Sequence, residues 1–368
     1  MRTALLLLAA CVAGCATVPA PPTAAERAER WWGDVAALAD DRMEGRLTGT
    51  PGYQRAADHV VSRLQEIGLE PAGADGFFQP VPLEEQWVDA AGSSAALLGG
   101  GETVRLGIPQ DLIVSRGLGR RPRQIEAPLV FIGYGLHVPE VGHDDLVGVD
   151  LTGKIAVVVS GGPEEISGAL KSHARGERAR LIEERGAIGM ITLTTPKAVE
   201  VPWSRAMAQA AQSGMYFADP ALREVKGEFF SAAFNTDTTE RLFARSGHSF
   251  AEIAALADAS KPLPRFELKQ SLRATLATRH RSLSAPNVVA RIPGTDPKLR
   301  AEHVVFSAHL DHLGVGTPIN GDGLYNGAMD NAAGVSGMLD IARSYKERRV
   351  RPKRSLLFVF VTGEEKGL

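Results

Sequence analysis

Cysteine is nearly absent from this sequence of 368 residues, which contains only Cys11 and Cys15. If a signal peptide is removed before Cys15, no pair remains for a disulfide within the chain. An excess of basic residues is absent as well, because 41 Lys and Arg are balanced by 43 Asp and Glu, for a net charge of −2. Nucleic-acid binding needs clustered positive charge, so this balance argues against a nucleic-acid partner. Thiolate metal sites and disulfide-stapled folds are excluded too.

One apolar run lies at the N-terminus. Met1–Cys15 has a single Arg, then leucines and alanines, and ends in Val12-Ala13-Gly14-Cys15, which predicts a signal peptide at residues 1–14. The run is too short to span a bilayer comfortably. Its ending resembles a bacterial lipoprotein signal, which implies lipidation of Cys15 and an anchor in the cell envelope, at the outer membrane facing the periplasm; secretion is the alternative. The proline-containing residues 15–23 predict a spacer.

The stretch Glu302–Leu368 predicts a strand, a loop, a helix and a second strand. His303–Ala308 and Ser355–Thr362 are apolar runs typical of buried strands, and Asp330–Arg349 has helical spacing. This order predicts a parallel βαβ unit, in which both strands end at the same edge of a sheet. Ligand sites of open α/β sheets lie at that edge.

Polar side chains follow both strands and open the helix: His309, Asp311, His312, Asp330, Glu364 and Glu365. Imidazole and carboxylate groups without thiolates suit zinc, and Asp330 is placed to bridge two ions. Adjacent Glu364 and Glu365 repel each other unless a cation lies nearby, which predicts that one binds metal and the other holds water. Asp311 is placed to accept a hydrogen bond from the ring of His309.

Three segments carry a family resemblance: Ser307–Gly314 (SAHLDHLG), Asn326–Arg343 (NGAMDNAAGVSGMLDIAR) and Arg354–Leu368 (RSLLFVFVTGEEKGL). They resemble the zinc-dependent aminopeptidase family, which also includes glutamate carboxypeptidase. The resemblance implies a peptide substrate and two zinc ions, with the roles as follows: His309 and Glu365 as ligands, Asp330 as the bridge, Glu364 as general base and Asp311 orienting His309. A glutamate carboxypeptidase-like exopeptidase, a glutaminyl cyclase and a non-catalytic binding lipoprotein stay open as alternatives to an aminopeptidase.

The remaining sequence predicts a peptidase domain in two parts, residues 24–110 and 265–368, around an insert at residues 111–264. The predicted fold is α/β, a mixed and mostly parallel sheet flanked by helices, with a β-rich insert. Phe131–Glu140 and Asp150–Gly161 resemble a protease-associated domain, which implies a lid or substrate-selecting wall, or else a purely structural insert. Before the insert, two helices flank turns at Glu44-Gly45-Arg46 and Gly49–Gly52, which either shape the rim of the site or lie at the surface.

The pattern outside the motifs also predicts individual elements. Short strands are expected between Pro80 and Gly107, and two separate strands at Phe266–Leu272 and Asn287–Ile292. Further strands are expected at Ala127–Tyr134, Gly153–Ser160 and Ala187–Leu193, and helices at Ser167–Arg185, Thr239–Gly247 and Phe250–Ala257.

The set of candidate metal ligands is smaller than a complete site requires. A catalytic zinc usually has three protein ligands, whereas His309 with Asp330, and Asp330 with Glu365, provide two for each ion. The family pattern supplies further ligands downstream, so the stop at Leu368 predicts a truncated peptidase domain with impaired activity, whose last strand lacks later sheet partners and covering helices. His303 and His312 are the candidates to substitute for the missing ligands.

Overall fold

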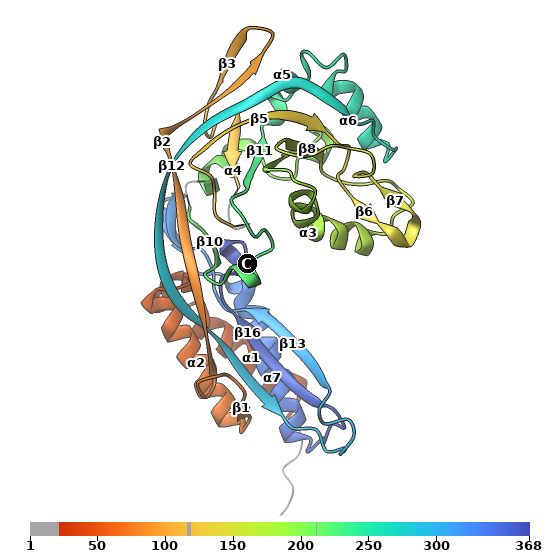
Figure 1. Cartoon of the computed structure of the whole chain (residues 1–368). Helices are drawn as coiled ribbons and strands as arrows, with labels where there is room; N and C mark the ends of the chain where they lie inside the picture. Colours follow the sequence, from red (N-terminus) through yellow and green to blue (C-terminus); the bar gives the residue numbers. More distant parts are fainter. Residues whose placement is uncertain (1–21, 116–118, 211) are drawn as a thin grey trace, which may run out of the picture.

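A computed structural model describes residues 22–115, 119–210 and 212–368. The predicted signal peptide, the predicted lipidation site Cys15 and most of the spacer lie outside these residues. Within the described ranges, no helix combines the length and the apolar character needed to cross a membrane. The chain forms two lobes joined by a pair of very long strands, and the C-terminus lies where the lobes meet (Figure 1).

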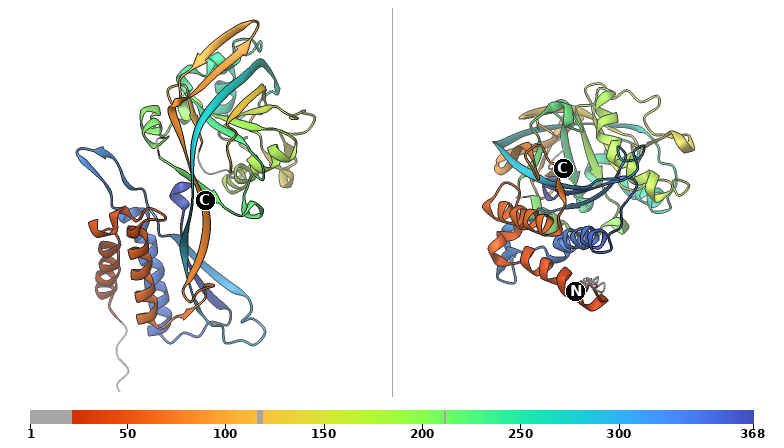
Figure 2. Two further views of the ribbon diagram at one scale, coloured as in Figure 1. Left: turned by 60° about the vertical axis from the view of Figure 1, so that its left-hand side comes forward. Right: turned by 90° about the horizontal axis from the view of Figure 1, so that it is seen from below.

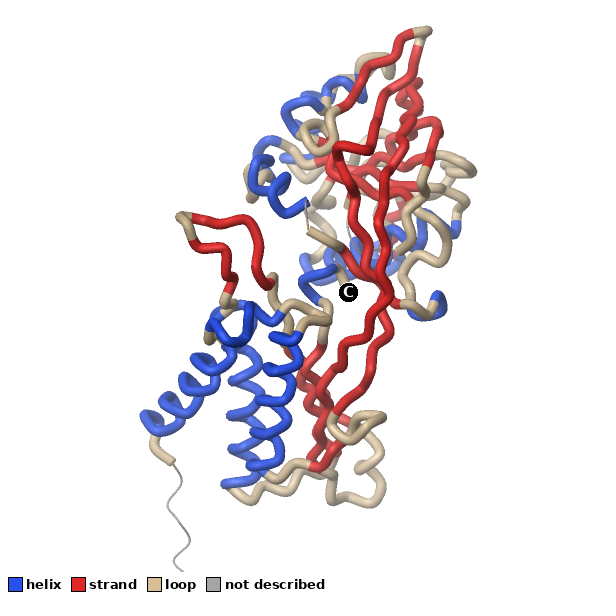
Figure 3. The backbone as a smooth tube through the Cα atoms, turned by 90° about the vertical axis from the view of Figure 1, so that its left-hand side faces the viewer, coloured by secondary structure: helices blue, strands red, loops and turns tan. Residues whose placement is uncertain are grey.

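The long strands are β2 (Phe78–Gly99) and β12 (Phe266–Ile292), which pair antiparallel from one lobe to the other (Figures 1 and 3). The expectations of short strands after Pro80 and of two separate strands within Phe266–Ile292 were therefore wrong. The residues between the two predicted strands also pair with β2, with one register shift between Thr275 and Ala277, so the ribbon stays continuous. Backbone pairing is independent of side-chain type, which explains why the hydrophobic pattern did not reveal it.

In the helical lobe, helices pack on one face of the sheet (Figure 2). They are α1 (Ala24–Leu38), α2 (Pro51–Ile67) and α7 (Ala333–Glu347). Thr23 and Glu26 form a capping box at the start of α1, and Gly68 in the left-handed conformation ends α2 as predicted. Their apolar faces pack on the sheet through a core that includes Val60, Leu64, Val335, Leu339 and Phe358.

The predicted βαβ unit is present in this lobe. Strand β13 (His303–His309) pairs in parallel with β16 (Ser355–Val361), and α7 lies between them in sequence. The last strand, β16, pairs with two strands that precede it in sequence, because it lies between β12 and β13. In the part of the chain that is described, β13 is instead the edge strand, with Val304 and Val305 exposed.

The insert lobe contains a second sheet region continuous with the first. Strands β5 (Gln124–Phe131), β8 (Ile155–Val159), β9 (Gly189–Leu193) and β11 (Phe230–Phe234) pair in parallel, and α3 (Gly168–Glu184) is the long helix of the lobe. The core of this lobe runs from Ala95 to Leu276, so it uses side chains on both sides of the predicted insert bounds at 111 and 264.

Shorter elements complete the two lobes. The strands are β1 (Glu70–Pro71), β3 (Glu102–Leu106), β4 (Leu112–Val114), β6 (His137–Val138), β7 (His143–Asp144), β10 (Gly214–Phe217), β14 (Gly314–Ile319) and β15 (Asp322–Tyr325). The helices are α4 (Trp203–Ala210), α5 (Glu240–Phe243) and α6 (Phe250–Asp258). Helix α5 is shorter than the predicted Thr239–Gly247. The predicted α/β class with a mixed sheet flanked by helices is confirmed, although the ribbon makes antiparallel pairing more extensive than expected.

Candidate metal centre

The polar residues of the βαβ unit meet at the carboxyl ends of β13 and β16. The two strands end in register, with His309 opposite Val361, and Leu310 then donates its backbone N–H to the Val361 carbonyl at 2.8 Å. Because this bond holds the two loops together beyond the last strand pair, it brings His309 close to the short turn η7 (Glu364–Lys366). The edge predicted to hold the site is therefore where the structure gathers these side chains.

Five of the predicted side chains lie within reach of one another. His309 Nε2 is 2.9 Å from Asp330 Oδ1 and 3.8 Å from Glu364 Oε2. His312 Nδ1 is 2.6 Å from Glu365 Oε1. Two groups of donor atoms, each within 4.8 Å, result: His309 with Glu364 and Glu365, and His312 with Asp330 and Glu365. The peptide bond that follows Asp330 is cis.

Asp311 lies beneath this cluster and is fully buried. Its carboxylate accepts backbone N–H bonds from Glu364 at 3.3 Å and from Glu365 at 3.2 Å. The ring of His309 donates instead to the main-chain carbonyl of Asp311 at 3.1 Å, so the predicted contact between the two side chains is corrected. Burial raises the pKa of the Asp311 carboxyl, while the backbone bonds and His309 act in the opposite direction. Asp311 thus fixes the turn that carries both glutamates.

The two alternative histidines lie in different places. His303 is at the start of β13, the opposite end of that strand from His309, and is exposed. His312 is mostly buried, and its imidazole donates to Glu365 within the cluster. Of the two, His312 alone is placed to contribute to a metal site at this edge.

Arg46 also belongs to this site, and its burial was not predicted from the sequence. Its side chain is fully buried, and Nε donates to the Leu310 carbonyl at 2.9 Å. The two Nη atoms donate to the carbonyls of Leu38, Asn326 and Gly327, at 2.6 to 2.9 Å. Burial lowers the pKa of Arg46 to about 10, with Asp311, Asp330 and Glu365 acting in the opposite direction, so the group stays charged at neutral pH.

Arg46 therefore connects the loop after His309 with the loop before Asp330. Its own carbonyl accepts the backbone N–H of His312 at 3.1 Å, which ties it to the first loop a second time. The interpretation of Glu44-Gly45-Arg46 as a surface turn does not hold for Arg46. No local signal announces this role, since its carbonyl partners lie up to 281 positions away in sequence.

Two glycines allow these segments to approach so closely. A Cβ on Gly45 would lie 2.5 Å from the Tyr325 carbonyl oxygen, and one on Gly327 would lie 2.5 Å from the His312 ring. Both glycines have φ near +63°, at 63° and 64°, which side chains rarely adopt. The N-terminal turn and the loop before Asp330 are consequently locked against each other.

The donor set fits zinc. Neutral imidazole and carboxylate oxygens are ordinary zinc ligands, and the two groups of donors share Glu365. Glu364 and Glu365 are adjacent in sequence and both face the cluster, an arrangement that a divalent cation would stabilise. A cationic site of this composition can polarise a carbonyl group and activate water for hydrolysis.

Comparison with known proteins agrees with the motifs. Residues 287–368 match the family model of Peptidase family M28, which confirms the family resemblance in this part of the chain. An aminopeptidase from Aneurinibacillus sp. strain AM-1 is similar in structure, with 18% identity, a TM-score of 0.43, and coverage of 92% of this chain and 63% of that one. BSAP, a zinc aminopeptidase from Bacillus subtilis, has 17% identity, a TM-score of 0.37, and coverage of 92% and 62%. The chain thus spans less than two thirds of the length of these two structures.

Proposed function

We propose that this chain carries the metal centre of a zinc-dependent metallopeptidase that removes residues from the N-terminus of peptides. The observation that carries the proposal is the meeting of His309, Asp330, Glu364 and Glu365 at one strand edge, inside the segment that matches Peptidase family M28. Removal from the N-terminus is the commoner activity in the family that the motifs resemble.

Each residue has a distinct part in this proposal. His309, Asp330 and Glu365 hold zinc, with Asp330 shared between two ions, and His312 hydrogen-bonds Glu365. When bound, zinc supplies the positive charge that polarises the scissile carbonyl and acidifies water. The Glu364 carboxylate accepts a proton from the attacking water and passes it to the leaving amine. Asp311 positions Glu364 and Glu365 through their backbone amides.

The first test is the zinc content of the purified chain, measured by elemental analysis after dialysis. The proposal expects the chain to retain zinc, but fewer than two ions per chain, because the candidate ligands provide only two side chains for each ion. His309→Ala should lower this content, whereas His303→Ala, at the other end of β13, should leave it unchanged. Equal zinc content in both variants and the parent would overturn the assignment of His309 as a ligand.

The second test separates the candidate activities with blocked peptides. An aminopeptidase cleaves a short peptide with a free amine and a C-terminal amide, and leaves its N-acetylated counterpart intact. Cleavage of the acetylated peptide from its free carboxyl end would favour a carboxypeptidase. Cyclisation of an N-terminal Gln without hydrolysis would favour a cyclase, and binding without turnover would favour a non-catalytic protein.

We also propose that the protein is attached to the bacterial envelope through a lipid at Cys15, as the lipoprotein-like N-terminus suggests. Expression with radiolabelled palmitate should label the protein, and Cys15→Ser should abolish the label. Equal labelling of the two would rule out Cys15 as the attachment site.

A further inference from the structure

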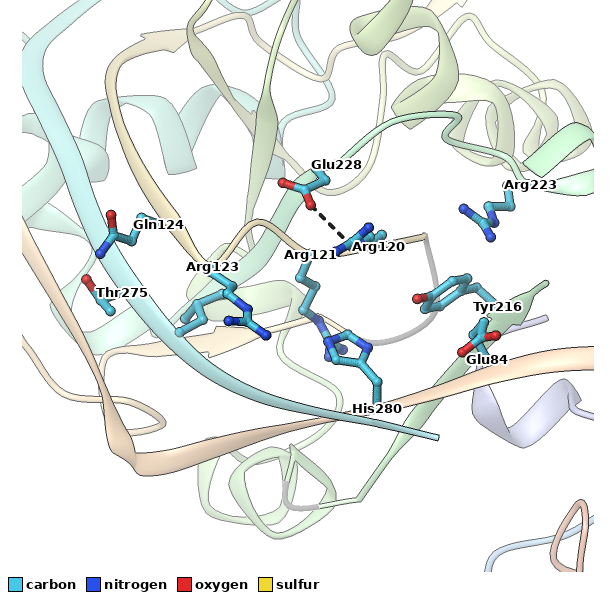
Figure 4. Close-up of a pocket in the computed structure, with 11 residues that line it drawn as sticks. Glu84, Arg120, Arg121, Arg123, Gln124, Tyr216, Arg223, Glu228, Thr275 and His280 are labelled. Atoms are coloured by element: carbon cyan, nitrogen blue, oxygen red, sulfur yellow. Dashed lines mark ion pairs between the residues drawn. The ribbon is translucent and has the colours of Figure 1, made fainter. Parts of the chain in front are cut away.

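A cavity of about 890 Å³ opens on the insert lobe beside the long ribbon. Four arginines line it, Arg120, Arg121, Arg123 and Arg223, together with the carboxylates of Glu84 and Glu228 (Figure 4). Three of the arginines come from one short segment just before β5. Such a concentration of guanidinium groups is unusual in a chain whose net charge is −2.

Two carboxylates line the cavity together with the four guanidinium groups. Glu228 forms an ion pair with Arg120 at 3.2 Å, and Glu84 accepts a hydrogen bond from the Ser282 hydroxyl at 2.7 Å. Burial lowers the pKa of His280, on the cavity wall, and the nearby Arg120, Arg121 and Arg123 lower it further. Cationic groups that crowd together in this way create a positive potential, which an anion would relieve.

The guanidinium groups differ in how they are held. Arg223 donates to the carbonyls of Phe217 and Ala218 at 2.7 Å and lies over the Tyr216 ring, so it is fixed in place. Arg120 has a side chain that is 62% exposed, and Arg123 is exposed as well. The cavity therefore combines a fixed guanidinium with exposed ones that can move onto a ligand.

Strand β10 lies beside both the cavity and the turn of the candidate metal centre. Tyr216 on this strand lines the cavity and is the direct partner of Glu84 on β2. The same strand contacts the turn η7, which carries Glu364 and Glu365. Strand β10 therefore connects one wall of the cavity to the turn that carries the two glutamates.

We propose that this arginine cavity binds a carboxylate group of the peptide held at the metal centre, so that peptides with acidic residues or a nearby free C-terminus are the preferred substrate class. The inference rests on the proposed peptidase function. Guanidinium groups match carboxylates in a planar, two-bond geometry, which makes arginine well suited to this recognition. A peptide that presents its amine to the metal centre directs its carboxyl end away from it, which agrees with removal of residues from the N-terminus.

Binding of two matched peptides tests the proposal. One is Leu-Glu-Glu and the other Leu-Gln-Gln-amide, each with its first peptide bond reduced so that it cannot be cleaved. Calorimetry on the zinc-loaded chain should show about tenfold tighter binding of the acidic peptide, decreasing as salt is raised. Equal affinities of the two peptides would overturn the proposal.

Variants then locate the preference. Arg120→Gln combined with Arg123→Gln should abolish it, since both side chains are exposed and their replacement does not disturb the core. Arg279→Gln is the control, because Arg279 is next to His280 on β12 and its side chain points to the opposite face of the strand. A preference that survives the double substitution, or is lost in the control, contradicts the assignment. Inorganic phosphate serves as a second probe, followed through the NMR resonances of His280. If phosphate shifts these resonances but the protein binds the two peptides equally, the cavity binds free anions and the proposal is contradicted.

Hydrolysis of the unreduced peptides separates this proposal from the proposed function. Suppose that the zinc-loaded chain prefers the acidic peptide through its arginines but hydrolyses neither peptide. This result would contradict the peptidase proposal and the view that the bound anion is part of a substrate. The anion site itself would still be established. Hydrolysis at equal kcat/KM for both peptides would overturn the arginine cavity alone. The expected result is hydrolysis of both, with the acidic peptide favoured about tenfold through KM.

Discussion

The candidate metal centre and the arginine cavity both gather charged side chains, but they hold them in opposite ways. At the metal centre the supporting groups, Asp311 and Arg46, are fully buried and bonded to the backbone. At the cavity, Arg120 and Arg123 are exposed and project from one extended segment. A buried charge must be satisfied by the protein itself, whereas an exposed one remains available to a ligand. The first site is therefore preorganised, and the second is adaptable.

The largest expected effect lies at the metal centre. Glu364→Gln keeps the shape of the side chain but removes the base, so kcat for a neutral peptide should fall about 10²- to 10⁴-fold. Zinc content and acidic-peptide binding should both be retained, as elemental analysis and calorimetry can check. Glu302→Gln, at the start of the edge strand, is the matched control and should keep full activity. Unchanged turnover in the Glu364 variant would remove it as the base.

The contrast between buried and exposed arginines predicts a large difference in stability. Arg46→Met leaves four carbonyls without their donor, so the free energy of unfolding should fall by about 3–5 kcal/mol. Arg123→Met removes an exposed side chain and should change it by less than about 0.5 kcal/mol. Urea unfolding followed by circular dichroism measures both. Similar losses in the two variants would show that the two arginines are not held differently.

A smaller effect is expected for the histidine that pairs with Glu365. His312→Gln removes the 2.6 Å contact with that carboxylate, so zinc affinity should fall about 10- to 100-fold. Competition with a coloured chelator gives the affinity directly. His303→Gln provides the comparison at the other end of β13 and should bind zinc as the parent does. An unaltered affinity after loss of His312 would exclude it from the metal site.

The smallest effect concerns protonation at the cavity. Burial and three arginines lower the pKa of His280, so the unfolded chain takes up this proton first as the pH falls. His280 therefore lowers the free energy of unfolding as the pH falls through the ordinary imidazole range. Above that range His280 is neutral in both states and has no such effect. Arg120→Gln with Arg123→Gln should raise the pKa of His280 toward its usual value in an NMR titration. Arg291→Gln, farther along β12, should leave it in place, and a shift in this control would point to a general charge effect.

Local sequence patterns predicted that the residues of the candidate metal centre lie at one sheet edge, because these residues lie in one continuous stretch of sequence. The strand, helix and strand of the βαβ unit all follow from apolar periodicity, and polar residues at their ends mark the edge. Arg46 could not be assigned in the same way, since three of its four carbonyl partners lie in two distant segments, at Leu310 and at Asn326–Gly327. Only folding brings them together.

The arginine cavity was missed for a related reason. Its walls come from residues between Glu84 and His280, and the overall charge balance conceals a local excess. The core of the insert lobe also includes Ala95 and Leu276 on the long strands, which lie outside the predicted insert at residues 111–264. Hydrophobic patterns predict which residues are buried. They do not predict whether a buried residue belongs to the core of the helical lobe or to that of the insert lobe.

The ribbon of β2 and β12 also determines how the molecule can be taken apart. Removal of residues 111–264 would leave the upper halves of both strands in place, with Ala95, Leu97, Leu272 and Ala274 stripped of the side chains that cover them. A graft of the insert onto another scaffold would have to carry those strand halves with it. The insert lobe therefore cannot be exchanged as a separate domain, because it shares strands β2 and β12 with the sheet of the helical lobe.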